Sequence, residues 1–285
     1  MAISETGRSV EELFRANTFE ASGRAPVTEL LDLTGRAVVV VGGAGPGLGQ
    51  AITHRLASLG ADVMVADLDA DAAAEVADAV ASRHGTQVVA HQADATRPEA
   101  VAQLVDTTLS RFGKIDVLVN SMGGGGSGRF LEQSLEDYSR IIDINLNSMV
   151  YTTRAVADVM IPRKQGAIVN VSSIGSVIPR TRAALYSACK AAVSALTRGL
   201  AWELSEHGVR INAVCPGLMA SSRLVSVLEG EEQGLYARSL GLALESTALG
   251  RPANPAEVAD VVTFLASDAS SFVQGAVWDS SGGMS

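Results

Sequence analysis

The chain has 285 residues, of which 47% are hydrophobic and 19% charged, a balance that predicts a water-soluble protein with a large buried core. Its formal net charge of −9 argues against binding to nucleic acid or to membranes, because both surfaces attract clustered basic residues. No apolar run reaches the ~20 residues that span a bilayer, and the N-terminus lacks a secretory signal, so we expect a cytoplasmic protein.

The cysteines and histidines predict neither a disulfide framework nor a metal site. There are two cysteines, Cys189 and Cys215, and the four histidines are scattered without the spacing of metal ligands.

From about residue 31 onward, apolar strand-like segments alternate with helical segments rich in Ala, Leu and Val. The strand-like segments are 37–41, 62–66, 87–90, 115–120, 167–171, 210–214 and 276–278, and the helical segments are 48–59, 69–83, 97–112, 131–161, 183–206 and 255–267. This alternation predicts the α/β class, with one doubly wound Rossmann domain over 31–285 and a seven-stranded parallel sheet covered by helices on both faces. Residues 1–30 are expected to form an N-terminal extension, either a partly ordered tail or an arm on a neighbouring subunit.

The first predicted strand runs into a glycine-rich turn, Gly42-Gly43-Ala44-Gly45-Pro46-Gly47-Leu48-Gly49, that leads directly into a helix. Glycines let backbone N–H groups approach a pyrophosphate at the helix N-terminus, where the helix dipole favours negative charge. We therefore predict that a dinucleotide cofactor contacts Gly43, Gly45, Gly47, Leu48 and Gly49.

The second strand ends at Asp67, where a carboxylate can accept both ribose hydroxyls of NAD and repel the 2′-phosphate of NADP. No Arg or Lys lies in 42–50 or 66–75 to attract that phosphate, so NAD is the predicted cofactor. Leu68 is expected to contact the cofactor beside Asp67, whereas Asp69 is expected to cap the next helix.

Ser173, Tyr186 and Lys190 predict acid–base chemistry. Ser173 follows the strand 167–171, and the other two residues lie four apart on the helix 183–206, hence on one helix face. An ammonium beside a phenol favours the phenolate, and a nearby hydroxyl can hold a carbonyl or alcohol oxygen.

In chain order, residues 31–285 also contain Asp94-Ala95-Thr96 after the third strand, Asn120, Asn145, Pro216-Gly217 and Gly282-Gly283. Together with the glycine turn, Ser173, Tyr186 and Lys190, this ordered set resembles the short-chain dehydrogenase/reductase family, in its Tyr-x-x-x-Lys form with an NAD-preferring Asp.

The resemblance implies roles for individual residues. It makes Tyr186 the general acid/base, Ser173 the ligand of the substrate oxygen, Lys190 the ligand of the nicotinamide ribose, and Asn145 the holder of a relay water. It also implies that the residues along the cofactor include Asp94, Ala95, Asn120, Pro216, Gly217, Leu218 and Ser221.

The function expected from these residues is hydride transfer between nicotinamide and a secondary alcohol or ketone. The substrate pocket should involve 123–128, 174–177 and an apolar lid at about 218–250. The family also implies a homotetramer or homodimer built partly from the helices 131–161 and 183–206. Three alternatives are a 3-oxoacyl-thioester reductase that uses NADPH, a catalytically silent NAD-binding sensor, and a structural partner subunit whose N-terminal arm matters more than its site.

The sequence departs from the family pattern at four places. Gly42 replaces a Thr, Ser121-Met122-Gly123 replaces Asn-Ala-Gly, Ser221 replaces a Thr, and Ser281 replaces an Asp. We expect the first change to remove a hydrogen bond from the turn and the last to remove a loop anchor.

Overall fold

The computed structural model describes residues 23–124, 128–179, 182–221, 224 and 241–284. Its strands form a seven-stranded sheet in the order β3-β2-β1-β4-β5-β6-β7, and every neighbouring pair is parallel. The strands are β1 (Ala37–Val41), β2 (Asp62–Asp67), β3 (Val88–Gln92), β4 (Val117–Asn120), β5 (Gly166–Val171), β6 (Val209–Pro216) and β7 (Val277–Ser280). The predicted doubly wound parallel sheet is confirmed, and each predicted strand overlaps an observed one.

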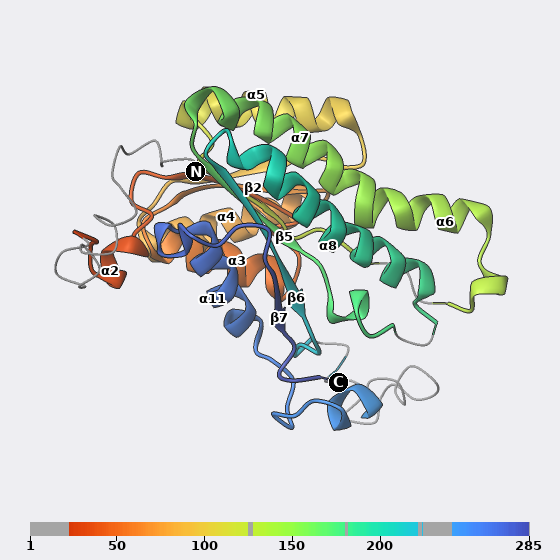
Figure 1. The fold of residues 1–285 in the computed structure, drawn as a ribbon. Helices are drawn as coiled ribbons and strands as arrows, with labels where there is room; N and C mark the ends of the chain where they lie inside the picture. Colours follow the sequence, from red (N-terminus) through yellow and green to blue (C-terminus); the bar gives the residue numbers. More distant parts are fainter. Residues whose placement is uncertain (1–22, 125–127, 180–181, 222–223, 225–240, 285) are drawn as a thin grey trace, which may run out of the picture.

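Helices cover both faces of the sheet (Figure 1). One face carries α3 (Leu48–Ser58), α4 (Ala70–His84) and α11 (Pro255–Ala266), and the other carries α5 (Pro98–Phe112), α7 (Ser148–Met160) and α8 (Ala184–Ser205). All five residues of β1 are buried, with Val38 and Val40 packed into one apolar cluster and Val39 and Val41 into the other. Strands buried on both faces in this way read as continuous apolar runs. None of the described helices is both long and apolar enough to cross a membrane.

The prediction of one regular helix over 131–161 was wrong at its start and in its regularity, although the backbone is helical from Leu135 to Met160. The helix α6 (Leu135–Ile142) begins at a capping box between Ser134 and Asp137. A π-helical segment, Asp143–Asn147, then joins α6 to α7. Hydrophobic periodicity missed this segment because a π turn adds only one residue to an otherwise helical pattern.

The division into extension, domain and lid stays a prediction. Residues 1–22 of the extension, and 222–223 and 225–240 of the lid, lie outside the described residues. The described end of the extension includes α2 (Val27–Leu30), and before it Arg24 donates to the Asp268 carbonyl at 3.3 Å and to Ser271 Oγ at 2.8 Å.

A buried carboxylate holds the amino edge of the sheet together. The Asp116 side chain is 1% exposed and pairs with Lys114 at 2.8 Å and Arg163 at 2.7 Å. It also accepts the backbone N–H of Ala37, at the start of β1, at 2.9 Å. Burial alone would raise the pKa of Asp116, but hydrogen bonds from Lys114, Arg163 and Ala37 outweigh it and lower the pKa below its ordinary value. The ionised carboxylate therefore links β1, β4 and the turn after α7.

We predict that Asp116→Asn lowers the free energy of unfolding at pH 7 by about 2–4 kcal/mol, because two partly exposed cations lose their buried carboxylate. A depressed folded pKa stabilises the fold above the unfolded pKa, and this stability is lost as pH falls through the folded pKa. In urea unfolding, the difference between variant and unmodified protein should therefore shrink below about pH 4.

The matched control is Asp260→Asn, which opens the exposed pair between Arg55 and Asp260 and should change stability by less than about 1 kcal/mol. Equal effects of the two substitutions, or a difference that does not change with pH, would contradict the role of Asp116.

Candidate active site

The glycine-rich turn between β1 and α3 has no room for side chains where it meets the helix. A Cβ at Gly49 would overlap the carbonyl oxygen of Gly42. Thr53 of α3 supports the turn, since its hydroxyl donates to the carbonyls of Gly43 at 3.1 Å and Gly49 at 3.0 Å. Among the described residues no side chain caps α3, whose N-cap is Gly47. The first N–H groups of this helix are thus left for a ligand, and the helix dipole favours an anionic one.

Asp67, at the end of β2, lies against this turn. Its Oδ2 accepts the backbone N–H of Ala44 at 3.0 Å, and its Oδ1 accepts that of Asp69 at 3.3 Å. Asp69 itself accepts two N–H groups of the first turn of α4, which confirms its predicted capping role. Leu68 is 66% exposed on the same edge. Asp67, which is predicted to bind the adenine ribose, is therefore in direct contact with the turn that is predicted to bind the pyrophosphate.

Gly42 and Met122, at two of the positions that depart from the family pattern, lie next to each other. Gly42 has φ of +76°, and a Cβ there would lie 2.9 Å from the backbone nitrogen of Met122. The turn after β1 therefore approaches the segment after β4 more closely than a residue with a side chain would permit. Beyond the expected loss of a hydrogen bond, the glycine thus brings two loops of the site together.

Lys190 is buried at the centre of the carboxyl edge of the sheet. Its side chain comes from α8, the residue is 3% exposed, and Nζ donates to the carbonyls of Val171 at 2.9 Å and Met122 at 3.4 Å. Nζ also lies 5.9 Å from the centroid of the Tyr186 ring. Burial lowers the pKa of Lys190 to about 8. Gly123 has a φ of +154°, and a Cβ there would lie 2.8 Å from this ammonium, so a side chain at this position would strain the loop and displace the end of Lys190.

Ser173 and Tyr186 converge on one point. Ser173 follows β5 in an extended conformation, and its Oγ accepts the backbone N–H of Gly175 at 3.1 Å. A Cβ placed on Gly175 would lie 3.3 Å from Ser173 Oγ and 3.9 Å from Tyr186 Cε1. Because Ser173 Oγ already accepts a hydrogen bond, its own proton is left to donate to a further oxygen.

Asn145 is aimed at the same region by the π segment. Its amide donates to the carbonyls of Gly124 at 2.8 Å and Ile141 at 2.9 Å, and its Oδ1 accepts the N–H of Gly124 at 2.9 Å. The side chain is 2% exposed and thus clamps the loop after β4. The role implied for it by the family, holding a relay water, stays a prediction.

Asn120 is at the end of β4 with its side chain in the interior. The amide donates to Asn170 Oδ1 at 2.9 Å and Thr153 Oγ1 at 3.1 Å, and accepts from Thr152 Oγ1 at 2.7 Å. Asn170 continues the chain to Thr197 of α8 at 3.0 Å. This fully buried network ties β4 and β5 to α7 and α8, and sequence reasoning did not find it.

The remaining predicted cofactor residues also lie at the carboxyl edge. Asp94 accepts both the N–H (3.0 Å) and the hydroxyl (2.6 Å) of Thr96, and Ala95 between them is 9% exposed. Pro216 ends β6, followed by Gly217 and the buried Leu218, and Ser221 Oγ accepts the Leu224 N–H at 3.2 Å.

The expectation that Ser281 leaves a loop unanchored was wrong. Its hydroxyl accepts the N–H of Met284 at 3.1 Å, so a serine can hold this loop. A Cβ at Gly217 would lie 2.7 Å from the Ser281 Cα, which shows how closely the loops after β6 and β7 approach each other.

An apolar cluster lies beside Ser173. Its buried members come from the segments after β5 and β6, from the described end of the predicted lid, and from the C-terminus: Ile174, Leu218, Leu224, Ala243 and Met284. The part of the predicted lid that the structure describes thus packs beside the site.

One buried group near the site was not expected. Ser187 Oγ has no hydrogen-bond partner within the described part of the chain, and it lies 3.5 Å from the Cβ position of Gly175. Its place directly after Tyr186 was the only signal in the sequence. Cys189 and Cys215 are both buried free thiols.

Comparison with known proteins identifies relatives along nearly the whole chain. A family model described as enoyl-(acyl carrier protein) reductase matches residues 43–285. The chain is 35% identical to 3-oxoacyl-[acyl-carrier-protein] reductase from Synechocystis, covering 87% of this chain and 96% of the relative. It is 34% identical to the 7alpha-hydroxysteroid dehydrogenase of Escherichia coli, covering 89% and 95%. It is 36% identical to meso-2,3-butanediol dehydrogenase from Serratia marcescens, covering 84% and 90%.

Solved structures show the same similarity. A 7 alpha-hydroxysteroid dehydrogenase complexed with NADH and 7-oxo glycochenodeoxycholic acid superposes with a TM-score of 0.83 at 31% identity, covering 92% of this chain and 98% of that one. A short-chain type dehydrogenase/reductase from Mycobacterium marinum superposes with a TM-score of 0.82 at 29% identity, covering 92% and 99%. With this fold and this arrangement of Ser173, Tyr186 and Lys190, the chain belongs to the short-chain dehydrogenase/reductase family and is an oxidoreductase.

Proposed function

We propose that the chain is an NAD-dependent dehydrogenase that oxidises a secondary alcohol, or reduces the corresponding ketone. The observation that carries this proposal is the convergence of Ser173 and Tyr186 beside the buried Lys190, on the same sheet edge as the glycine turn. A cofactor laid along that edge could reach both the turn and the substrate.

The described residues fit a nicotinamide dinucleotide. The uncapped N-terminus of α3 suits the pyrophosphate, Asp67 suits the adenine ribose, and Lys190 suits the nicotinamide ribose. The remaining contacts are proposed for the other predicted cofactor residues, from Asp94 to Ser221. When bound, the cofactor accepts or supplies a hydride at C4 of its nicotinamide.

Tyr186 moves the proton in this proposal. In oxidation its phenolate takes the proton of the alcohol, and in reduction its phenol donates to the carbonyl oxygen. Ser173 donates its hydroxyl proton to the same oxygen. That proton is available because Oγ acts only as the acceptor in its hydrogen bond with the Gly175 N–H. Lys190 stays mostly charged at pH 7, since its pKa is about 8, and its charge favours the phenolate. Asn145 shapes the loop beside them and would hold the relay water.

The apolar cluster around Ile174 and Leu218 supports an uncharged, largely apolar substrate.

A second candidate function, reduction of a 3-oxoacyl thioester, is favoured by the similarity to the Synechocystis reductase. Asp67 argues against the NADPH form of that reaction. A panel of secondary alcohols, ketones and acetoacetyl-coenzyme A, followed at the nicotinamide absorbance, separates the two. A silent sensor would bind NAD and turn over none of them.

We further propose a cytoplasmic homotetramer or homodimer. Large apolar side chains are exposed on the helices expected at the interface, with Leu135 of α6 80% and Trp202 of α8 87% exposed. Burial of such side chains against a second copy removes apolar surface from water. Sedimentation velocity at micromolar concentration should show a single species larger than the monomer. A monomer would refute the assembly and leave the chemistry untouched.

Tyr186→Phe should lower kcat by at least ~10²-fold while the affinity for NAD changes little, because only the ionisable oxygen is removed. Steady-state turnover and NAD titration measure the two effects. A variant that kept most of its turnover would overturn the assignment of the general base.

The matched control is Tyr151→Phe on α7, which removes the same oxygen from a partly buried tyrosine outside the site and should leave turnover unchanged.

In the unmodified enzyme, the rate of alcohol oxidation should rise with pH as Tyr186 ionises. In Lys190→Ala the midpoint of that rise should move toward the ~10 of free tyrosine, and NAD binding should weaken as well. An unchanged midpoint would contradict the electrostatic role of Lys190.

NAD(H) should bind about tenfold or more tightly than NADP(H), and Asp67→Ala should narrow this gap by removing the charge that repels the 2′-phosphate. Because Asp67 also accepts the Ala44 N–H, Asp67→Asn is the sharper variant: it keeps an acceptor for the turn and loses only the charge. Asp62→Asn, at the opposite end of β2, should leave the ratio of affinities unchanged. Equal affinities of the unmodified protein for both cofactors would refute the assignment of NAD.

A further inference from the structure

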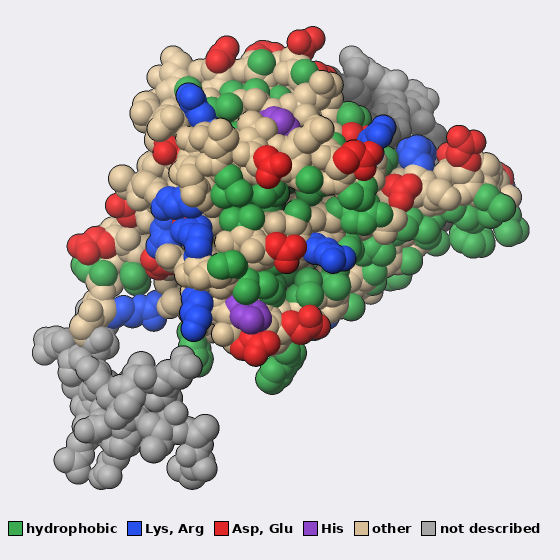
Figure 2. Space-filling view, turned by 90° about the horizontal axis from the view of Figure 1, so that it is seen from above, with side chains coloured by type: hydrophobic (Ala, Val, Ile, Leu, Met, Phe, Trp, Pro, Cys, Tyr) green, Lys and Arg blue, Asp and Glu red, His purple; other side chains and the backbone are tan. Residues whose placement is uncertain are grey.

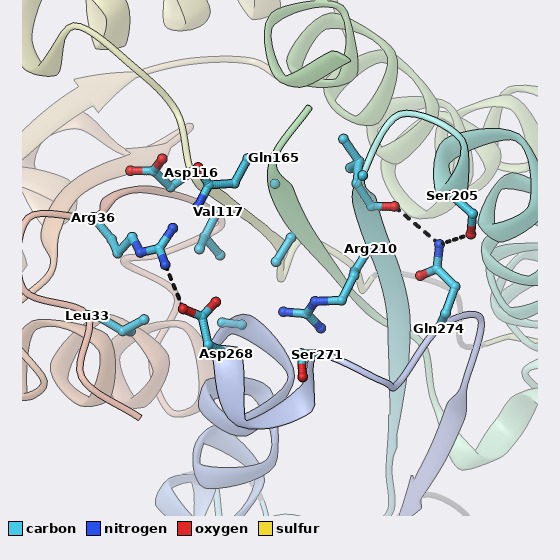
Figure 3. A pocket seen from close by; sticks show the side chains of 15 residues that line it. Leu33, Arg36, Asp116, Val117, Gln165, Ser205, Arg210, Asp268, Ser271 and Gln274 are labelled. Atoms are coloured by element: carbon cyan, nitrogen blue, oxygen red, sulfur yellow. Dashed lines mark hydrogen bonds and ion pairs between the residues drawn. The ribbon is translucent and has the colours of Figure 1, made fainter. Parts of the chain in front are cut away.

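A cavity of about 340 Å³ lies at the amino ends of the strands, at the opposite edge of the sheet from the glycine turn (Figure 3). This volume is within the range of small-molecule sites, roughly 300–1,000 Å³. Its lining includes Arg36 before β1, Gly166 at the start of β5, Arg210 in β6, and Asp268 and Gln274 after α11. The cavity is thus separate from the proposed active site.

Guanidinium groups outnumber carboxylates at one side of this cavity. Arg36 pairs with Asp268 at 2.8 Å, and Figure 3 shows Arg210 approaching Asp268 from the other side. Arg24 reaches the same segment through the Asp268 carbonyl and Ser271. On this side the described lining of the cavity therefore holds two arginines, Arg36 and Arg210, and one carboxylate, that of Asp268.

Within the described part of the chain, the hydrogen bonds that Arg210 donates all go to uncharged groups. Its guanidinium donates to the carbonyls of Leu265 (3.0 Å), Ser267 (2.9 Å) and Ser270 (3.1 Å) and to the Ser270 hydroxyl (2.7 Å). Burial lowers the pKa of Arg210, Asp268 opposes that change, and the nearby charge of Arg36 adds to it. The C-terminus of α11 contributes only about half a negative charge. A positive excess therefore remains beside the cavity.

The acid on the other side of the cavity does not remove this excess. Asp116 is already paired with both Lys114 and Arg163, so that group carries a further positive charge. Gln274 is also engaged, since its amide donates to Ala201, Ser205 and Val209 and its oxygen accepts the Ile211 N–H. Arg36 differs from these groups. It has five N–H donors, and its guanidinium contacts one acceptor, Asp268, among the described residues.

We propose that this cavity binds a small anion through a carboxylate or phosphate group, with Arg36 as the principal contact and Arg210 as an electrostatic support. A planar guanidinium matches such groups with two parallel hydrogen bonds. Asp268 now holds Arg36 in place and competes with the ligand for it. The proposal is independent of the oxidoreductase function.

The test is calorimetric titration of the full chain at low salt with two probes, citrate as a polycarboxylate and inorganic phosphate. One saturable site per chain is expected for at least one probe, with an affinity that falls as salt rises. Saturation by citrate alone identifies the ligand as a carboxylate, and saturation by phosphate alone identifies a phosphate group. No saturation by either probe up to about 10 mM would overturn the proposal.

Two substitutions should act in opposite directions. Arg36→Gln should weaken binding at least about tenfold, whereas Asp268→Asn should strengthen it several-fold by removing the competing carboxylate. The control Arg55→Gln opens another exposed arginine–aspartate pair, on α3, and should have no effect on binding. If Arg36→Gln does not fold, the Asp268→Asn titration still decides the matter. Weaker or unchanged binding in Asp268→Asn would contradict the proposed competition and refute the site.

Discussion

The buried ammonium of Lys190 is the constraint on which the carboxyl edge of the sheet depends. A charge removed from water is unstable unless hydrogen bonds or opposite charges replace the water. No carboxylate contacts this ammonium among the described residues, and two backbone carbonyls, of Val171 and Met122, take that place. The end of β5 and the loop after β4 must therefore be held against α8. Gly123 permits the approach, and Asn145 clamps the next residue of the same loop.

The interior below this edge is organised to keep those carbonyls in position. Asn120 and Asn170 are neighbours in register on β4 and β5, and their amides share a hydrogen bond inside the core. Threonines of α7 and α8 satisfy the remaining donors and acceptors, so the network is rigid as well as buried. The helices α7 and α8 are thereby fixed to β4 and β5, and α8 carries both Tyr186 and Lys190. Figure 2, which views the molecule from above, shows acidic and basic side chains scattered over the surface that these helices cover.

The features that were predictable from sequence are those that depend on local chemistry. Buried parallel strands need continuous apolar runs, which is why segments such as 37–41 could be placed, and Asp69 could be assigned as a cap from its position before a helix. The carboxyl ends of the strands share one edge in any doubly wound sheet, so the grouping of the glycine turn, Asp67 and Tyr186 followed from topology.

What could not be predicted depends on contacts between distant segments. Three features depend on residues that follow or belong to different strands. They are the close approach of Gly42 to Met122, the amide network of Asn120 and the cavity beside Arg36. Ser281 was misjudged for a related reason: whether a short hydroxyl reaches its partner depends on how the loop folds, and here it reaches Met284.

The π segment at Asp143–Asn147 determines which side of α7 faces the sheet. An α-helix turns by about 100° per residue, so the one additional residue in the π turn rotates α7 by that angle relative to α6. Val156 and Met160 face the sheet in this phase, while Arg154 and Asp158 face outward. Loss of a single residue from the segment would restore an unbroken α-helix and, in doing so, turn charged side chains of α7 toward the core. The number of residues between the N-terminal cap of α6 and the end of α7 therefore cannot change by even one without turning α7 about its axis.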